Sequence, residues 1–173
     1  MAVLLVALAA SPGSSSNWFG WKQGFNSIMR FDLCSLTSQK HSAWHEQNDP
    51  QVDGHWQLDE TFLETRHFHL CDTTQEVEVR DYNHADDSRL GWWHCHEWAN
   101  PNVCAWGHVH INLRYSYNDN TALTIMCHEV GHSVGLAHPS SDDPDTCMVT
   151  PVNNTKRHLR LHDVNLINNN YGS

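Results

Sequence analysis

The chain has 173 residues, of which 39% are hydrophobic and 17% charged, so it is long enough for one globular domain with a core and short for two. Its 10 basic and 20 acidic residues give a formal net charge of −10, which argues against nucleic acid and anionic membrane surfaces as partners. Eight tryptophans supply large apolar side chains that can fill a core or line a groove.

The first 16 residues are predicted to precede the folded domain, which we expect to span residues 17–173. Residues 3–10 form an apolar run too short to cross a bilayer, and a stretch rich in Ser, Pro and Gly follows it. This order is typical of a secretory signal and its cleavage zone, although no Lys or Arg occurs before Lys22. A tail without regular structure and a buried N-terminal strand remain alternatives. We expect a secreted monomer that does not bind membranes.

The chain contains six cysteines, an even number that indicates disulfides when it accompanies a secretory signal. Sequence does not choose among the possible pairings, but local closure suggests Cys95–Cys104, with Cys34–Cys71 closing a longer loop. A cysteine-based zinc site is disfavoured because the chain has no CxxC pair. The remaining two are Cys127 and Cys147.

Three elements are predicted in the first half of the chain. The segment "IMRFDL" at residues 28–33 predicts a first strand, and "LDETFLETRHFHL" at residues 58–70 predicts a helix. In "EVEVRDY", residues 76–82, valine alternates with charge, which is typical of a half-buried strand.

Two further strands are predicted around a turn at Asn100 and Pro101. The segments "WWHCHEW", residues 92–98, and "AWGHVHINL", residues 105–113, both alternate in side-chain character.

Two helices are predicted in the last third of the chain. The first runs over residues 121–135, with Asn120 as its N-cap and Gly135 ending it in a left-handed turn. The second lies within "LHDVNLINNNYG", residues 161–172, where apolar residues recur at helical spacing.

The predicted helix at residues 121–135 carries a pattern of metal ligands. His128 and His132 are four residues apart, so their imidazoles leave the same face one turn apart, and Gly135 lets the chain return His138 as a third ligand. Three neutral imidazoles with a fourth position open for water favour zinc. Glu129 lies beside this position and can take a proton from the water. The alternative is a set of surface histidines on an amphipathic helix.

Met148 follows ten positions after His138. "HEVGHSVGLAH" followed by this methionine resembles the metzincin clan of zinc peptidases, whose signature is HExxHxxGxxH with a Met-turn. The short gap to Met148 and the C-terminal segment "LHDVNLINNNYG" are similar to the matrixin family, and "HVHINLRYS" resembles small secreted actinobacterial members. The resemblance is tight from Cys127 to Met148, loose from Glu76 to Gly172, and poor over the first 70 residues.

The resemblance implies an α+β protein with the metzincin-like zincin fold. This fold has a twisted mixed sheet of about four or five strands, a zinc-binding helix beneath the cleft, a Met-turn and a C-terminal helix. It also implies one catalytic Zn²⁺ on His128, His132 and His138. Glu129 would be the general base and acid, and Met148 would pack beneath the ligands without binding the metal.

For the substrate, the resemblance implies a protein or peptide held in extended form. Residues 149–153 would wall the pocket for the side chain just after the cut, and the strand at residues 92–98 or its neighbour would hold the substrate by strand addition.

Cys127 and Cys147 each stand directly beside an element of the predicted site. A disulfide between them would tie the zinc helix to the Met-turn, and this pairing is our hypothesis. Two buried free thiols are the alternative.

A second metal site is weighed against a simpler interpretation. His94 and His96 share one face of their predicted strand, and His108 and His110 share one face of theirs, so four imidazoles meet if the strands pair. Matrixins carry a second zinc, but its usual Asp partner pattern is not evident here. Solvent-facing histidines are therefore preferred over a structural zinc. A calcium contact at residues 142–145 is likewise less favoured than a plain acidic turn.

The sequence thus predicts a secreted zinc endopeptidase. One alternative is a non-catalytic zinc or peptide-binding module on a peptidase scaffold, which the intact Glu129 argues against. Another is a processing peptidase that cuts one partner, and a third is metal scavenging by a protein with 15 histidines.

Overall fold

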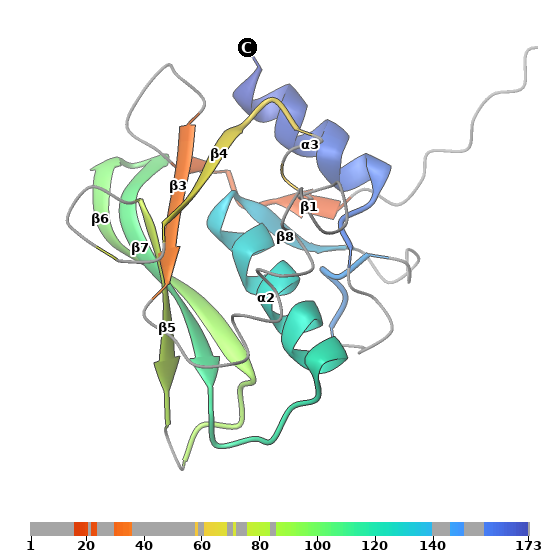
Figure 1. Cartoon of the computed structure of the whole chain (residues 1–173). Helices are drawn as coiled ribbons and strands as arrows, with labels where there is room; N and C mark the ends of the chain where they lie inside the picture. The colour runs from red at the N-terminus through yellow and green to blue at the C-terminus, as the bar shows by residue number, and fades with distance from the viewer. Residues whose placement is uncertain are drawn as a thin grey trace, which may run out of the picture.

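The computed structural model describes residues 16–20, 22–23, 30–35, 58, 61–68, 71, 76–83, 86–139, 146–150 and 158–172. Of the predicted N-terminal segment only Ser16 falls within these ranges, where it begins the strand β1 (Ser16–Trp18). A six-stranded sheet lies on one side of the long helix α2, and a two-stranded sheet with the helix α3 lies on the other (Figure 1).

The large sheet is mixed, as predicted, but has six strands. Parallel pairing joins β2 to β7, β7 to β5, β5 to β3 and β3 to β4, while β6 pairs antiparallel with β7 and is the outermost strand on its side. The strands are β2 (Lys22–Gln23), β3 (Arg30–Ser35), β4 (Glu64–Phe68), β5 (Val77–Tyr82), β6 (Gly91–Asn100) and β7 (Val103–Asn112).

The inner face of the sheet forms the core with α2. Val77 and Val79 on β5 and Val109 on β7 are fully buried. Every second side chain of a strand points to the same face of the sheet, and in these strands that face packs against the helix. Glu78, between the two valines, is also buried on the opposite face, where it pairs with Arg80. The predicted alternation of β5 is therefore present, but its charged side is not simply exposed to water.

The two strands predicted around Asn100 and Pro101 form the hairpin β6–β7. Their antiparallel register places His94 opposite His108, and the amide of Asn102 donates to the Asn100 side chain at 2.9 Å in the turn. The Cys95–Cys104 disulfide crosses the hairpin. Cys71 is also disulfide-bonded, whereas the side chain of Cys34, its predicted partner, lies outside the described part of the structure.

The helix predicted at residues 121–135 is α2 (Asp119–Ser133), which begins two residues earlier. The prediction of Asn120 as N-cap is wrong: the cap is Asn118, whose side chain accepts from the Thr121 amide at 2.9 Å. Both asparagines suit the cap chemically, and only Asn118 has the extended backbone that a cap requires. At the other end Gly135 has φ +97°, the left-handed conformation predicted for it.

The predicted helix at residues 58–70 is wrong, because residues Glu64–Phe68 form the strand β4. β4 pairs in parallel along β3, from Arg30 opposite Glu64 to Cys34 opposite Phe68. This pairing satisfies the backbone of β4, and such tertiary pairing overrides a weak helical pattern. The predicted first strand at residues 28–33 is β3, shifted by two residues.

A second, small layer covers the C-terminal end of α2. β1 pairs antiparallel with β8 (Leu136–Pro139), and α3 (Leu161–Tyr171), the predicted C-terminal helix, contacts both strands. Among the residues that the structure describes, no helix is long and apolar enough to span a membrane.

The buried carboxylate of Asp163 holds α3 against the segment before Met148. It accepts from the Thr146 hydroxyl at 2.6 Å and from the Arg160 amide at 2.8 Å, and the Met148 amide donates to the same Thr146 oxygen at 3.2 Å. His162 contacts the other carboxylate oxygen at 2.9 Å. The first turn of α3 is therefore linked to the Met148 backbone through two side chains.

Replacing this carboxylate is expected to destabilise the fold. Asp163→Ala should lower the free energy of unfolding by about 3 kcal/mol, because it leaves the buried Thr146 hydroxyl and Arg160 amide without their acceptor. Denaturant unfolding measures the loss, with Asn165→Ala on the exposed side of the same helix as control. Equal stability of the two variants would contradict the role given to Asp163.

Candidate active site

Three imidazoles meet at the end of α2. His128 and His132 leave the helix one turn apart, and β8 brings His138 back beside them after the turn at Gly135. The three Nε2 atoms form a triangle in which each side is 3.1 Å. Sequence spacing predicted this convergence, and its cause is the left-handed turn, which only glycine adopts readily.

Two backbone carbonyls fix the hydrogen positions of two of these rings. His128 Nδ1 lies 2.9 Å from the Cys147 oxygen and His132 Nδ1 lies 2.8 Å from the Leu136 oxygen. A carbonyl only accepts, so each Nδ1 donates, and each neutral ring then directs an Nε2 lone pair into the triangle. The short Nε2–Nε2 distance between His128 and His132 is therefore not a hydrogen bond, because neither nitrogen carries a hydrogen.

This donor set fits a zinc ion. The three Nε2 atoms lie 3.1 Å from one another, so His128, His132 and His138 could together hold a divalent ion, and a set of imidazole nitrogens favours zinc. Burial lowers the pKa of His128 to about 4 and of His132 to about 3, and it also lowers the pKa of His138. All three rings are therefore neutral near pH 7, as metal ligands must be.

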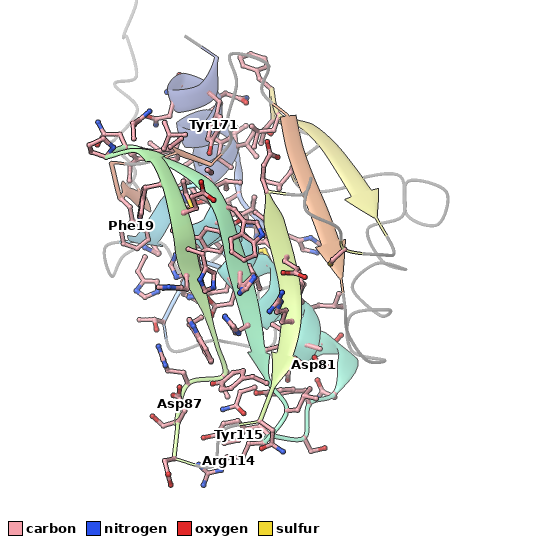
Figure 2. All side chains as sticks on the ribbon, turned by 90° about the vertical axis from the view of Figure 1, so that its left-hand side faces the viewer. Phe19, Asp81, Asp87, Arg114, Tyr115 and Tyr171 are labelled. Atoms are coloured by element: carbon pink, nitrogen blue, oxygen red, sulfur yellow. A yellow bond between two sulfur atoms is a disulfide. The ribbon has the colours of Figure 1, made fainter. Side chains whose placement is uncertain are left out.

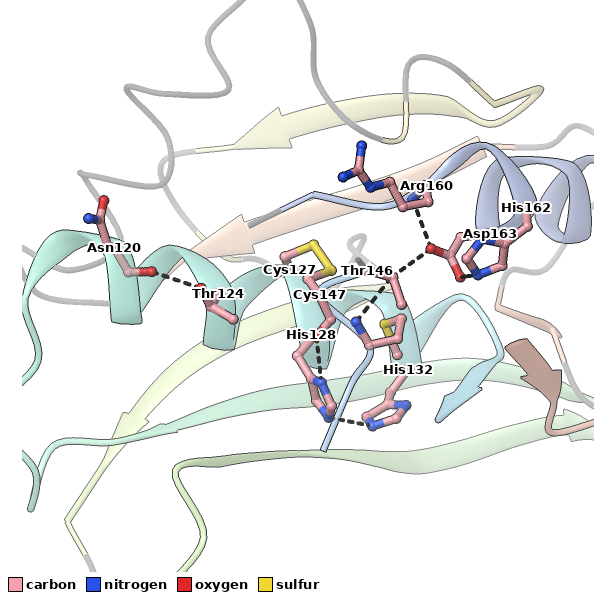
Figure 3. Close-up of a disulfide and its surroundings, with 11 residues drawn as sticks. Asn120, Thr124, Cys127, His128, His132, Thr146, Cys147, Arg160, His162 and Asp163 are labelled. Carbon is pink, nitrogen blue, oxygen red and sulfur yellow. Dashed lines mark hydrogen bonds and ion pairs between the residues drawn. A yellow bond between two sulfur atoms is a disulfide. The ribbon is translucent and has the colours of Figure 1, made fainter. Parts of the chain in front are cut away.

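The Cys127–Cys147 disulfide stands directly behind His128, with 6.0 Å between the Cα atoms (Figure 3). It joins α2 to the segment whose Cys147 carbonyl accepts from the His128 ring. The covalent link and the hydrogen bond thus connect the same two pieces of chain and hold the ring in one orientation.

Met148 is fully buried under the helix. A Cβ added at Gly131 would collide with the Met148 sulfur, so the thioether packs where α2 carries no side chain, between the turns of His128 and His132. Glycine at position 131 thereby makes room for the methionine.

Glu129 is 5% exposed and borders the cavity above the imidazoles. Burial raises the pKa of its carboxyl to about 8, while the charge of Arg89 and a hydrogen bond from the Trp93 backbone oppose this rise. The group therefore titrates near neutral pH, where a general acid or base works best.

The cavity encloses about 510 Å³ and runs along β6. Arg89 holds Asp87 through two nitrogens and lies 4.5 Å over the Trp92 ring, so its charge is already paired at the rim. Of the predicted pocket wall at residues 149–153, Thr150 borders the cavity and residues 151–153 lie outside the described ranges. The lining residues are Phe19, Arg89, Leu90, Gly91, Trp92, Trp93, His128, Glu129, His132, His138 and Thr150.

Comparison with known families agrees with this arrangement. The family model described as Matrixin matches residues 25–172, which is most of the chain. The chain belongs to the matrixin family. No individual curated protein sequence matches this matrixin significantly. Family membership supports a zinc metalloprotease of the α+β metzincin type, as the motif predicted, and a protein or peptide as its substrate.

A second group of histidines gathers on the outer face of the matrixin sheet. His96, His108 and His110 each offer a ring nitrogen within 4.8 Å of the others, whereas His94 is exposed and outside this triad. His108 is only 4% exposed, so the preferred interpretation of solvent-facing histidines is wrong for this residue. Glu78 Oε2 lies 2.8 Å from His108 Nε2. The acidic turn at residues 142–145, considered for calcium, lies outside the described residues.

Some residues of the cavity were not predicted from sequence. Arg89 lies between the predicted strands at residues 76–82 and 92–98, outside both, and Phe19 directly follows β1, which no pattern linked to the histidine helix. Trp93 belonged to a predicted strand, but its backbone contact with Glu129 depends on how that strand passes the helix.

The stability of the metal-free chain is expected to depend on pH through His128 and His132. The folded pKa values near 4 and 3 lie below the ordinary 6.5, so the contribution of His128 and His132 is present above pH 6.5 and is lost as pH falls toward 4. His132→Gln should reduce the slope of the free energy of unfolding against pH by up to about 1.4 kcal/mol per pH unit. Denaturant unfolding at several pH values in excess chelator measures this slope, with the exposed His94→Gln as control. An identical pH dependence in both variants would count against the assignment.

Proposed function

We propose that this matrixin is a secreted zinc endopeptidase with His128, His132 and His138 as zinc ligands and Glu129 as general base. The observation that carries the proposal is the triangle of Nε2 atoms beside a buried carboxyl at the floor of an open cavity. The disulfides support secretion, because such bonds persist in oxidising compartments.

The residues of the chain divide the work of hydrolysis. When bound, zinc supplies charge that polarises the scissile carbonyl, acidifies the attacking water and favours the ionised form of Glu129. The Glu129 carboxylate takes a proton from that water during attack and returns it to the leaving amine. Trp93 and Arg89 favour the carboxylate before the attack and again after the proton has been returned, since both stabilise its negative charge.

The strand β6 is the proposed platform for the substrate backbone. It is the outermost strand on its side of the described sheet, and its residues from Gly91 to Trp93 border the cavity beside Glu129. An extended peptide added to this edge would bring a peptide bond past the histidines. Cleavage of a peptide library would separate a general from a narrow peptidase.

The rival hypothesis of a non-catalytic binding module is disfavoured by the burial of Glu129. A carboxyl that is 5% exposed loses hydration on folding, and a module that only binds zinc or peptide gains nothing from this loss. Metal scavenging is disfavoured for the same reason, because the carboxyl stands beside an ordered ligand set.

Substitution of the base and of a ligand should have different effects. Zinc-loaded Glu129→Ala is expected to keep one zinc at the histidine triad and to lose about 10²–10⁴-fold in casein hydrolysis, because only proton transfer is removed. His132→Ala should lose both the metal and the activity. Metal analysis and casein cleavage by the parent and both variants test this. Undiminished cleavage by Glu129→Ala would overturn the base, and retention of zinc by His132→Ala would overturn the ligand.

We further propose that His96, His108 and His110 hold a second, structural zinc. Burial lowers the pKa of His108 and of His110 to about 4, so both rings are neutral donors. Within the described residues, His110 Nδ1 is buried without a hydrogen-bond partner, and such an atom needs an acceptor, a donor or a metal. Glu78 beside His108 supplies negative charge to the group.

The zinc content of variants tests the second ion. The parent should bind two zinc ions per chain, and His110→Ala should bind one while keeping casein cleavage, since the triad at α2 is untouched. His94→Ala is the matched control and should keep two. A parent that binds one zinc at saturation would contradict the second site.

A further inference from the structure

The N-terminal strand β1 lies against the strand that carries His138. Ser16 is opposite Pro139 and Trp18 is opposite Leu136 in an antiparallel pair, and the Phe19 amide donates to the Gly135 carbonyl at 3.0 Å. Residues 16–19 thus lie alongside the turn that connects the proposed zinc ligands His132 and His138.

The position of β1 is fixed from its other side by α3. The Trp18 ring packs edge-on against Tyr171 with centroids 6.1 Å apart, and the Tyr171 hydroxyl donates to the Val134 carbonyl at 3.2 Å. Phe19 and Tyr171 are seen at the same end of the molecule in Figure 2. Backbone pairing on one side and aromatic packing on the other therefore hold the chain at Phe19.

The Phe19 side chain itself faces the cavity. Its ring centroid is 5.4 Å from that of His132, tilted by 51°, and the residue lines the same cavity as Glu129 and Trp93. Phe19 is nevertheless 50% exposed. An aromatic ring held beside a catalytic centre with half its surface in water offers apolar area that a bound ligand can cover.

The rest of the cavity wall favours an apolar ligand group at this place. Leu90, Trp92 and Trp93 also line it, and Arg89 is occupied by Asp87 through two hydrogen-bonding nitrogens. An acidic substrate side chain would have to compete with Asp87, whereas an apolar one gains contact with Phe19 without breaking an existing pair.

We propose that Phe19 determines substrate specificity by contacting a large apolar side chain of the bound peptide beside the histidine triad. The proposal rests on the peptidase function proposed above and adds to it the chemical class of one substrate side chain. The residue that directly follows the N-terminal strand is then part of the substrate-binding surface, although it is far in sequence from the histidine motif.

A set of peptides tests the proposal. Each position on both sides of the scissile bond is varied in turn among Phe, Leu, Ala and Asp, and kcat/KM is measured for the parent and for Phe19→Ala. At one subsite, Phe19→Ala should lower kcat/KM for the Phe and Leu peptides by about tenfold and leave the Ala and Asp peptides within about twofold. The loss should lie mainly in KM, zinc content should be unchanged, and Phe19→Leu should restore part of the preference.

Phe62→Ala is the matched control, because Phe62 is 61% exposed and lies against Gly172, outside the residues that line the cavity. It should leave the preference of the parent intact. The proposal is overturned if Phe19→Ala keeps the parent's preference at every position, if it lowers kcat/KM equally for all peptides, or if it loses zinc.

A binding experiment separates this proposal from the peptidase function. Peptide hydroxamates that carry Phe, Leu, Ala or Asp are titrated calorimetrically into the zinc-loaded parent and Phe19→Ala, which requires no turnover. Suppose that the parent cuts no peptide, and that Phe19→Ala binds the Phe and Leu hydroxamates about tenfold more weakly than the parent but the Ala and Asp hydroxamates equally well. The peptidase function then fails and the role of Phe19 stands. Equal affinities in parent and variant, or no binding by the parent, overturn the role of Phe19.

Discussion

The hydrogen bonds from two imidazoles to backbone carbonyls are the constraint on which the site depends. The Cys147 and Leu136 oxygens fix the Nδ1 hydrogens of His128 and His132, and only then do the Nε2 lone pairs converge. Each carbonyl lies in a different segment, so both segments must be held near α2. The Cys127–Cys147 disulfide and the Asp163 network hold one of them, and the pairing of β1 with β8 holds the other.

Burial acts in opposite ways on the two kinds of group at this site. It lowers the pKa of His128 and His132, which keeps them neutral and able to bind metal, and it raises the pKa of Glu129 toward neutrality. One dry environment therefore prepares both the proposed ligands and the proposed base. Arg89 and the Trp93 backbone limit the rise in the pKa of Glu129. Both lie on the β6 side of the cavity.

The sequence was sufficient where local geometry decides. Helical spacing brought His128 and His132 together, and Gly135 adopts the left-handed turn that returns His138. It was insufficient where distant segments decide. Residues 64–68 form a strand only because β3 lies beside them, and Asn118 rather than Asn120 caps α2. Phe19 reaches the cavity because β1 pairs with β8, and the sequence around Phe19 does not predict this pairing. Burial of His108 likewise follows from the hairpin register and its contact with Glu78, neither of which alternation alone reveals.

The meeting of Trp18, Val134 and Tyr171 has a consequence for how the protein is made. The strand β1 leaves the ribosome early and has no partner until β8 has been synthesised, and the helix that packs against both emerges later still. A growing chain therefore carries the histidine motif for some time before its surroundings exist. High-affinity uptake of zinc, and with it any ability to cut other proteins, should arise only after α3 has been synthesised.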